Sequence, residues 1–344
     1  MHSKIEIFCG TGGVGKTTLS TARAISLTKK GNNCLLITID PSHRLKDYLK
    51  ISEIKPGQIY DVANPQINNT ADSKLSAMLM DVASTTKRIA QKSGSEKLLN
   101  SKFINILTSP FGGLNEIFAL VELYMQYEEK KYDYIILDTP PGGHFIDFLQ
   151  SINKIRRFFD SSFIEIFNHL NQESKNISIL KKVVASGAKT LLSYLKKVTS
   201  EEFIDDFLEA VYSLHDVKDI FLKTLSWDDL FENDNVTRWF LIGNYSHDKI
   251  SDILHMQDSL TSFKNKEKYI CLNRSNFEDL STWEPSSQVN QELKQSLLSK
   301  ELKVNSSLRE NSIKFISFLD IHSNDISLIL ENLSTQWSFQ KLEN

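Results

Sequence analysis

Short apolar runs bounded by polar or glycine-containing turns recur along the chain, and runs of this kind predict buried β-strands. They cover residues 5–8, 34–40, 75–81, 132–138, 237–242, 269–272 and 313–318. Apolar side chains at helical spacing predict helices over residues 19–29, 117–127, 250–263, 288–298 and 325–337. The strand at residues 5–8, the helix at 19–29 and the strand at 34–40 follow one another directly, which implies a right-handed βαβ unit. The sheet is therefore predicted to be mostly parallel. Residues 56–69 are expected to form a loop and residues 82–101 a polar helix.

Residues 151–232 contain no proline and one glycine, Gly187, and their apolar positions step by three and four, which predicts a block of helices. So many helical residues cannot all cover one sheet. We therefore expect an α/β fold with a doubly wound, mostly parallel sheet and a helical lobe inserted at about 82–130 and 151–232, within a single domain over residues 1–344. The aromatic residues of this lobe fit either a lobe core or a binding surface; they include Phe158, Phe159, Phe163 and Phe167.

A glycine-rich segment joins the first predicted strand to the first predicted helix. The segment has the spacing of a phosphate-binding loop (P-loop): Gly10 is followed by four residues and then by Gly15, Lys16 and Thr17. It also stands between a strand and a helix, as that motif requires. Glycines let backbone N–H groups turn toward phosphate oxygens, lysine neutralises the β- and γ-phosphates of ATP, and the hydroxyl binds Mg²⁺. A plain glycine turn, the alternative, requires neither Lys16 nor Thr17. The candidate binding residues are Gly10, Thr11, Gly12, Gly13, Val14, Gly15, Lys16, Thr17 and Thr18.

Two of the predicted strands end in an aspartate. Asp40 closes the second strand at the edge where doubly wound folds bind ligands, so it is a candidate for orienting a water; capping the next helix is the alternative. Asp138 closes strand 132–138 in the form of a Walker B element and would hold a water bound to Mg²⁺. Residues 139–144, rich in proline and glycine, suit a loop that changes shape with the γ-phosphate. The catalytic candidates are Lys16, Asp40 and Asp138, and the candidates around Mg²⁺ are Thr17, Asp40 and Asp138.

Composition excludes several classes of protein. Hydrophobic residues at 40% and charged residues at 24% exclude a disordered chain, and a net charge of -3 provides no positive footprint for nucleic acid. Cys9, Cys34 and Cys271 lie far apart within predicted strands, so we expect small core residues rather than disulfide partners or metal ligands. The chain starts with a strand and not with a charged and then apolar leader, and no run approaches the roughly 18 apolar residues of a membrane span. A cytoplasmic protein is expected.

Four segments resemble, in order and spacing, the motifs of the deviant-Walker ATPases of the ArsA and guided-entry type; they are residues 10–18, 38–43, 113–116 and 138–144. That family includes the arsenite-pump ATPase and the ATPase that targets tail-anchored membrane proteins. The resemblance covers most of the chain and implies a doubly wound sheet with a helical lobe, and hydrolysis of ATP across a homodimer. It also implies that Asp40 positions the attacking water in switch I, that Asp138 belongs to switch II, and that Asn273 recognises adenine.

Three features depart from the family pattern. Position 11 is usually a lysine that reaches the phosphates of the partner subunit, and here it is Thr11, which has neither the charge nor the reach. Arg44 and Arg274 are candidates for supplying that charge as an arginine finger, and the alternative that both are solvated surface residues stays open. The chain also lacks the CxxC pair that holds a shared zinc ion and the clustered cysteines that arsenite needs.

These observations lead to three functional hypotheses. The first is a Mg²⁺-dependent ATPase whose nucleotide state switches a homodimer and opens a groove of the lobe to an apolar helix of a membrane-protein client. The second is a subunit that energises an anion pump together with a membrane partner. The third is a nucleotide-binding regulatory protein with little hydrolysis. Function resides in the site and its client rather than in the fold, so the sequence alone does not separate them.

Overall fold

The computed structural model describes residues 3–39, 44–51, 55–62, 73–94, 115–142, 220, 223, 228–262, 264–340 and 342. The chain divides into two compact units. Met1–Met80, Met125–Asp147 and Asp229–Asn344 form the first, and Asp81–Tyr124 and Phe148–Asp228 form the second. Most of the predicted helical lobe, including Phe158, Phe159, Phe163 and Phe167, lies outside the described ranges. The lobe and the single-domain organisation therefore stay predictions.

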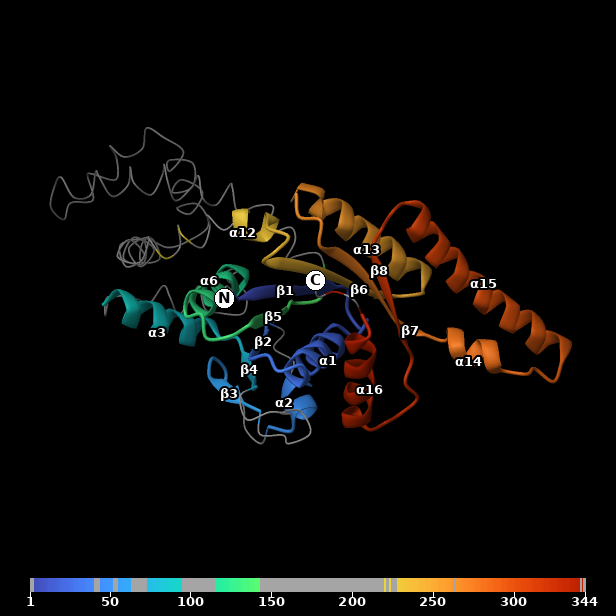
Figure 1. The fold of residues 1–344 in the computed structure, drawn as a ribbon, viewed down its shortest axis with the longest axis horizontal. Helices are drawn as coiled ribbons and strands as arrows, with labels where there is room; N and C mark the ends of the chain where they lie inside the picture. The colour runs from blue at the N-terminus through green and yellow to red at the C-terminus, as the bar shows by residue number, and fades with distance from the viewer. Residues whose placement is uncertain are drawn as a thin grey trace, which may run out of the picture. The chain divides into compact units, whose positions relative to one another are not determined.

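The first unit is built on a sheet of eight strands among the described residues, in the order β3-β4-β2-β5-β1-β6-β7-β8 (Figure 1). Neighbouring strands are parallel except for β3 and β4. In chain order they are β1 Lys4–Gly10, β2 Cys34–Thr38, β3 Ile59–Asp61, β4 Leu75–Leu79, β5 Tyr134–Asp138, β6 Thr237–Asn244, β7 Lys268–Ser275 and β8 Phe315–Leu319. All the strands that the apolar runs predict are present.

The prediction of a loop over residues 56–69 is wrong at Ile59–Asp61, which form β3. This strand pairs antiparallel with β4, with Tyr60 opposite Ala77. The Ser76 hydroxyl donates to Asp61 Oδ1 at 2.7 Å across the same pair. Because a strand of three residues is too short to show an alternating period, its pairing with β4 decides its conformation rather than its own sequence.

The helices, with the labels of Figure 1, are α1 Lys16–Lys29, α2 Arg44–Leu49, α3 Val82–Ser93, α6 Asn115–Glu128, α12 Asp228–Glu232, α13 His247–Ser259, α14 Phe277–Thr282, α15 Gln288–Glu310 and α16 Ile326–Ser338. The helix expected over residues 82–101 ends at Ser93, where Gly94 takes a left-handed conformation that commonly ends a helix. α15 continues well beyond its expected end at residue 298, and the periodicity did not predict the short helices α2 and α14. None of the helices in the described ranges combines the length and the apolar character that crossing a bilayer requires.

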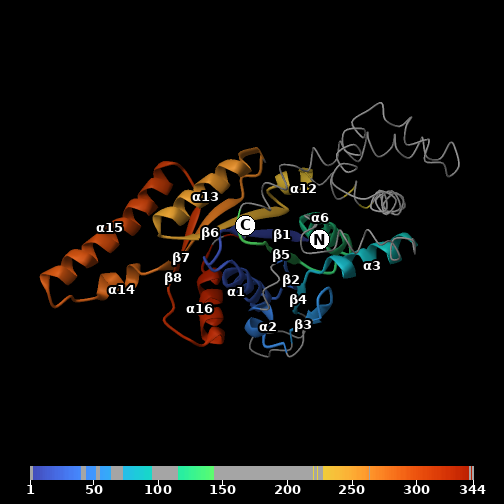
Figure 2. The same cartoon turned by 180° about the vertical axis from the view of Figure 1, so that it is seen from behind.

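Helices cover both faces of the sheet. α1 and α16 pack together on one face and α13 lies on the other (Figures 1 and 2). On the first face, the Trp337 indole lies 4.6 Å from the ring of Phe318 and donates to Leu19 O at 3.0 Å. On the other face Ile253 packs directly on Gly243, where a Cβ would lie only 1.8 Å from its Cδ1. The α/β fold with a doubly wound, mostly parallel sheet is therefore confirmed.

A buried carboxylate ties the inner strand β1 to α1. Arg23 of α1 donates from Nε and Nη2 to the two carboxylate oxygens of Glu6, at 2.9 and 2.8 Å, and both side chains are buried. Arg238 on β6 adds a contact to Glu6 at 3.2 Å. Burial by itself would raise the pKa of Glu6, but the charges and hydrogen bonds of Arg23 and Arg238 together lower it below its ordinary value. A charge-assisted contact thus fixes α1 on the sheet.

Replacing Glu6 by glutamine removes the negative charge beside Arg23 and Arg238. We expect the free energy of unfolding at pH 7, measured with urea, to fall by about 3 kcal/mol, the usual size for a broken buried ion pair. The stability that the lowered pKa of Glu6 contributes is fully present above the pKa of glutamate in the unfolded chain and is lost as the pH falls through the lower folded-state pKa. The difference between the two proteins should therefore shrink in acid.

The control is Lys249→Ala, which breaks a more exposed ion pair with Asp252 at 3.4 Å. It should cost less than about 1 kcal/mol because solvent screens such a pair. Equal losses for the two substitutions would contradict the assignment of a stabilising role to the buried contact.

Candidate functional site

The order of the strands brings predicted site residues to one edge of the sheet. β2, β5 and β1 are neighbours, and their carboxyl ends are Thr38, Asp138 and Gly10. Because these strands are parallel, their carboxyl ends lie at the same edge. The P-loop and Asp138 therefore meet, although they are far apart in the sequence. Asp40 lies outside the described residues, so its part in the site stays a prediction.

Close packing requires glycine at two positions of the loop. A Cβ at Gly10 would lie 2.3 Å from the carbonyl oxygen of Ile242 on β6. Gly15 has φ 94°, and a Cβ there would lie 2.3 Å from Nδ2 of Asn273. Gly15 is also the N-cap of α1 and offers no side chain to its first turn, so the partial positive charge of the helix start faces the loop. The loop thus combines a tight backbone with a favourable field for an anion.

Lys16 and Thr17 follow directly and carry the polar chemistry. Lys16 Nζ donates to Thr11 O at 3.0 Å, and the lysine side chain is buried. Thr17 Oγ1 donates to Asp138 Oδ2 at 2.7 Å, and Thr38 Oγ1 donates to the same oxygen at 3.0 Å. Asp138 itself is fully buried. An ammonium group, a hydroxyl and a carboxylate therefore lie around the first turn of α1.

Thr38 is a site residue that the sequence analysis did not single out. In the sequence it is an ordinary residue of an apolar strand. It faces Asp138 because the two residues are direct partners in the register of β2 against β5. Only the order of strands in the sheet reveals that pairing.

The loop fits a nucleoside triphosphate with Mg²⁺. The Thr11 hydroxyl is buried and has no hydrogen-bond partner in the part of the chain that the structure describes, and a buried polar atom of this kind points to a group still to be received. Among the described residues, no three acidic, histidine or cysteine side chains converge as a metal site. Mg²⁺ would instead be held by the Thr17 hydroxyl, by phosphate oxygens, and through water by Asp138, since Mg²⁺ usually keeps several waters.

The segment after Asp138 folds back on the start of the P-loop. The Thr139 backbone N and side-chain Oγ1 both donate to Phe8 O, at 3.2 and 2.8 Å. Gly142 N donates to Gly10 O at 3.0 Å. Hydrogen bonds therefore join residues 139–142 to the end of β1 and to the first residue of the P-loop. The remainder of this predicted switch, from Gly143 onward, lies outside the described residues.

Asn273 touches the other side of the loop. Its Nδ2 donates to Val14 O at 2.9 Å, and its Oδ1 accepts from Arg274 N at 3.0 Å. The side chain is buried. It thus links the end of β7 to the P-loop, next to where a nucleotide would lie. Recognition of adenine by Asn273 stays a prediction.

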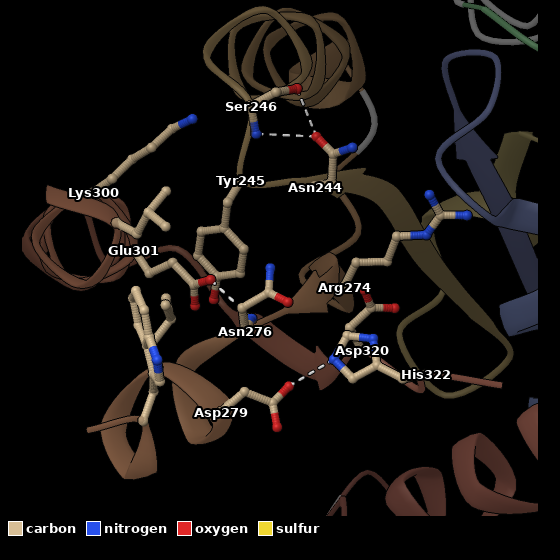
Figure 3. Close-up of a pocket in the computed structure, with 13 residues that line it drawn as sticks. Asn244, Tyr245, Ser246, Arg274, Asn276, Asp279, Lys300, Glu301, Asp320 and His322 are labelled. Atoms are coloured by element: carbon tan, nitrogen blue, oxygen red, sulfur yellow. Dashed lines mark hydrogen bonds and ion pairs between the residues drawn. The ribbon is translucent and has the colours of Figure 1, made fainter. Parts of the chain in front are cut away.

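A cavity of about 730 Å³ lies beyond Asn273, between the carboxyl ends of β6 to β8 and the helices α14 and α15 (Figure 3). Its polar walls are held by hydrogen bonds: Tyr245 Oη contacts Ser317 Oγ at 2.7 Å, and Glu301 accepts from Ser275 Oγ at 2.7 Å. Burial raises the pKa of Tyr245, an effect that its hydrogen bonds oppose. The cavity has the size of a small-molecule pocket.

The three cysteines are buried and free. Burial raises the pKa of Cys9 and of Cys34 to about 12, and it also raises that of Cys271. Thiols of this kind are neutral at physiological pH and are poor ligands for soft ions. Their predicted place in the core is confirmed.

Comparison with known proteins identifies related sequences. Residues 3–282 match the family model described as anion-transporting ATPase. The chain is 27% identical over 215 residues to an ATPase of Aquifex aeolicus named for driving an arsenical pump, covering 61% of this chain and 66% of that protein. It is 33% identical over 144 residues to ATPase GET3 of Malassezia globosa, covering 42% and 41% of the two chains. The chain thus spans two thirds or less of the length of these relatives.

Substitution of Gly15 by alanine tests the packing of the loop. The new methyl group would meet Asn273 Nδ2 in a backbone with φ 94°, so we expect the free energy of unfolding, measured with urea, to fall by about 2–4 kcal/mol from strain and overpacking together.

Gly31→Ala is the matched control. Gly31 has a similar φ of 92°, but a Cβ there meets nothing within 4 Å. The free energy of unfolding of the Gly31→Ala variant should fall by only about 1–2 kcal/mol, the cost of the left-handed backbone alone. If both variants lose the same stability, the contact between the loop and Asn273 is not a steric constraint.

Proposed function

Because the chain belongs to the ArsA family of anion-transporting ATPases, we propose that it binds Mg·ATP in the loop at residues 10–18 and hydrolyses it. The observation that carries this proposal is the contact between Thr17 and Asp138 at 2.7 Å. It joins the hydroxyl of a P-loop to the carboxylate of a Walker B strand, beside the ammonium group of Lys16. Phosphoryl transfer depends mostly on positioning and on stabilisation of charge, and these groups provide both.

Each residue then has a distinct task. Mg·ATP supplies the cation and the phosphoryl group that is transferred. Lys16 exchanges its bond to Thr11 O for phosphate oxygens, whose charge it neutralises. The Thr17 hydroxyl would help to hold Mg²⁺, and Asp138, which accepts its hydrogen bond, would orient that hydroxyl and hold the ion through water. Asp40 would position the water that attacks, in a reaction that we place in the cytoplasm.

Two substitutions separate binding from hydrolysis. Lys16→Ala should abolish measurable ATP binding, because it removes the cation of the loop. Asp138→Asn should retain binding, while kcat for phosphate release falls by about 100-fold or more, the usual loss when a preorganised charge is removed from a reacting centre.

The control is Asp133→Asn, the same change just before the opposite end of β5. Asp133 accepts a hydrogen bond from Asn33 N at 2.8 Å and is remote from the loop. It should leave kcat within about twofold of the wild type. A loss of turnover in this variant equal to that of Asp138→Asn would contradict a specific role for Asp138.

We further propose that ATP binding closes a homodimer and prepares the helical lobe for an apolar helix of a membrane protein. The supporting observation is the resemblance to the guided-entry ATPases, together with the matched relative named ATPase GET3. The candidate groove residues are those of the predicted lobe: Phe158, Phe159, Phe163 and Phe167. An amphipathic or apolar helix binds such a groove through side chains on one face.

An Asp40→Asn variant tests this second proposal. If Asp40 positions the attacking water, the variant should hold ATP without turning it over. It should then bind a fluorescent peptide of about 20 apolar residues in ATP but not in ADP, as measured by anisotropy, and light scattering should show a dimer. A peptide with charged residues at its centre is the control. Equal binding of the two peptides would contradict the proposal that the client is an apolar helix.

Energising an anion pump is the second candidate, because the family description and the Aquifex relative both name such a role. The buried, neutral cysteines provide no soft-ligand site for arsenite in the described part of the chain. Stimulation of ATP hydrolysis by arsenite, without an effect of the apolar peptide, would favour this candidate. Tight ATP binding with negligible turnover in the wild type would favour a regulatory protein instead.

A further inference from the structure

Arg274 has an unusual backbone conformation inside a strand. Non-glycine residues with positive φ in the described ranges are Lys50, Lys130, Arg274 and Ser312. Three of them lie within two residues of the end of a helix, where the left-handed conformation is ordinary. Arg274 lies instead within β7, with φ 59°, where the pairing with β8 shifts register between Leu272 and Ser275. Irregularities of this type re-aim side chains and are frequent beside active sites.

Two consecutive residues beside this register shift have different surroundings. Asn273 is buried against the P-loop through its bond to Val14 O at 2.9 Å, whereas Arg274 is exposed. The bond from Arg274 N to Asn273 Oδ1 at 3.0 Å holds this arrangement. A glycine at position 274 would adopt the same backbone without strain. The strained conformation with a long cationic side chain therefore points to a use for that side chain.

The guanidinium group is free to meet a ligand. It makes no hydrogen bond or ion pair with another side chain in the part of the chain that the structure describes. Figure 3 shows Tyr245, Asn276 and Glu301 gathered in the cavity, while Arg274 extends away from them toward the blue ribbon of the N-terminal segment. The preceding residue, Asn273, contacts Val14 of the P-loop, so the backbone of Arg274 lies one residue from a direct contact with that loop.

We infer that Arg274 is a second cation of the nucleotide site and that its guanidinium contacts a phosphate oxygen of the nucleotide bound in the same chain; this rests on the proposed function. Residues 10–18 contain one cation, Lys16, for the several charges of a polyphosphate. A guanidinium group suits this task because its planar fork of N–H donors matches phosphate oxygens and keeps its charge at every physiological pH.

The test compares Arg274→Gln with Arg274→Gly in the full-length chain. Equilibrium affinities for ATP, ADP and adenosine are measured at 0.05 and 0.5 M NaCl. Loss of a charge-assisted bond should weaken ATP binding about 10- to 100-fold in both variants. Adenosine binding should not change, and the loss for ATP should shrink at the higher salt concentration because salt screens the contact. Arg274→Lys should retain part of the affinity.

The glycine variant separates binding from folding. It removes the strain, so its midpoint of unfolding in urea should equal or exceed that of the wild type while its affinity for ATP falls. ATP affinity within twofold of the wild type in both variants would overturn the inference, and so would an equal loss for adenosine, which would assign Arg274 to the base. Failure of the wild type itself to bind ATP would instead overturn the proposed function.

Discussion

The carboxylate of Asp138 is the contact on which the arrangement of the site depends. It accepts hydrogen bonds from Thr17 at the start of α1 and from Thr38 at the end of β2, so it joins three elements at one edge of the sheet. Further along α1, the pair between Arg23 and Glu6 fixes the same helix to β1. Because both contacts are buried, α1, which follows the P-loop, is fixed on the sheet before a phosphate binds. Little ordering of the backbone is then needed when phosphate binds, which favours affinity.

The two sides of the P-loop are held by different kinds of contact. On the Asp138 side, Gly142 N donates to Gly10 O, a main-chain bond that a rearrangement can exchange for a ligand oxygen. On the β7 side, the buried amide of Asn273 bonds to Val14 O and is wedged against Gly15. One side of the loop is therefore suited to change with the nucleotide, and the other to stay fixed. A conformational switch needs both, because a movement is transmitted only against a rigid support.

The residues proposed to bind the nucleotide and those proposed to bind the client lie in different parts of the chain. Residues 10–18, Asp138 and Asn273 belong to the first compact unit, whereas the aromatic residues proposed for client binding belong to the second. Membership of the ArsA family is consistent with the first set of residues, and it does not specify what the second set binds. Family membership therefore does not by itself separate an ATPase that handles an apolar helix from one that drives a pump.

The sequence by itself determined the strands with continuous apolar runs, the P-loop and the candidate role of Asp138, because each of these depends on a period or a spacing within a few neighbouring residues. Only the tertiary structure decided that Ile59–Asp61 form a strand and that Thr38 shares the oxygen of Asp138 with Thr17. It likewise decided that Arg274, next to a register shift in β7, is exposed while the preceding Asn273 contacts the P-loop. These features join segments far apart in the chain through the order and register of the strands, and no local pattern of residues contains that information.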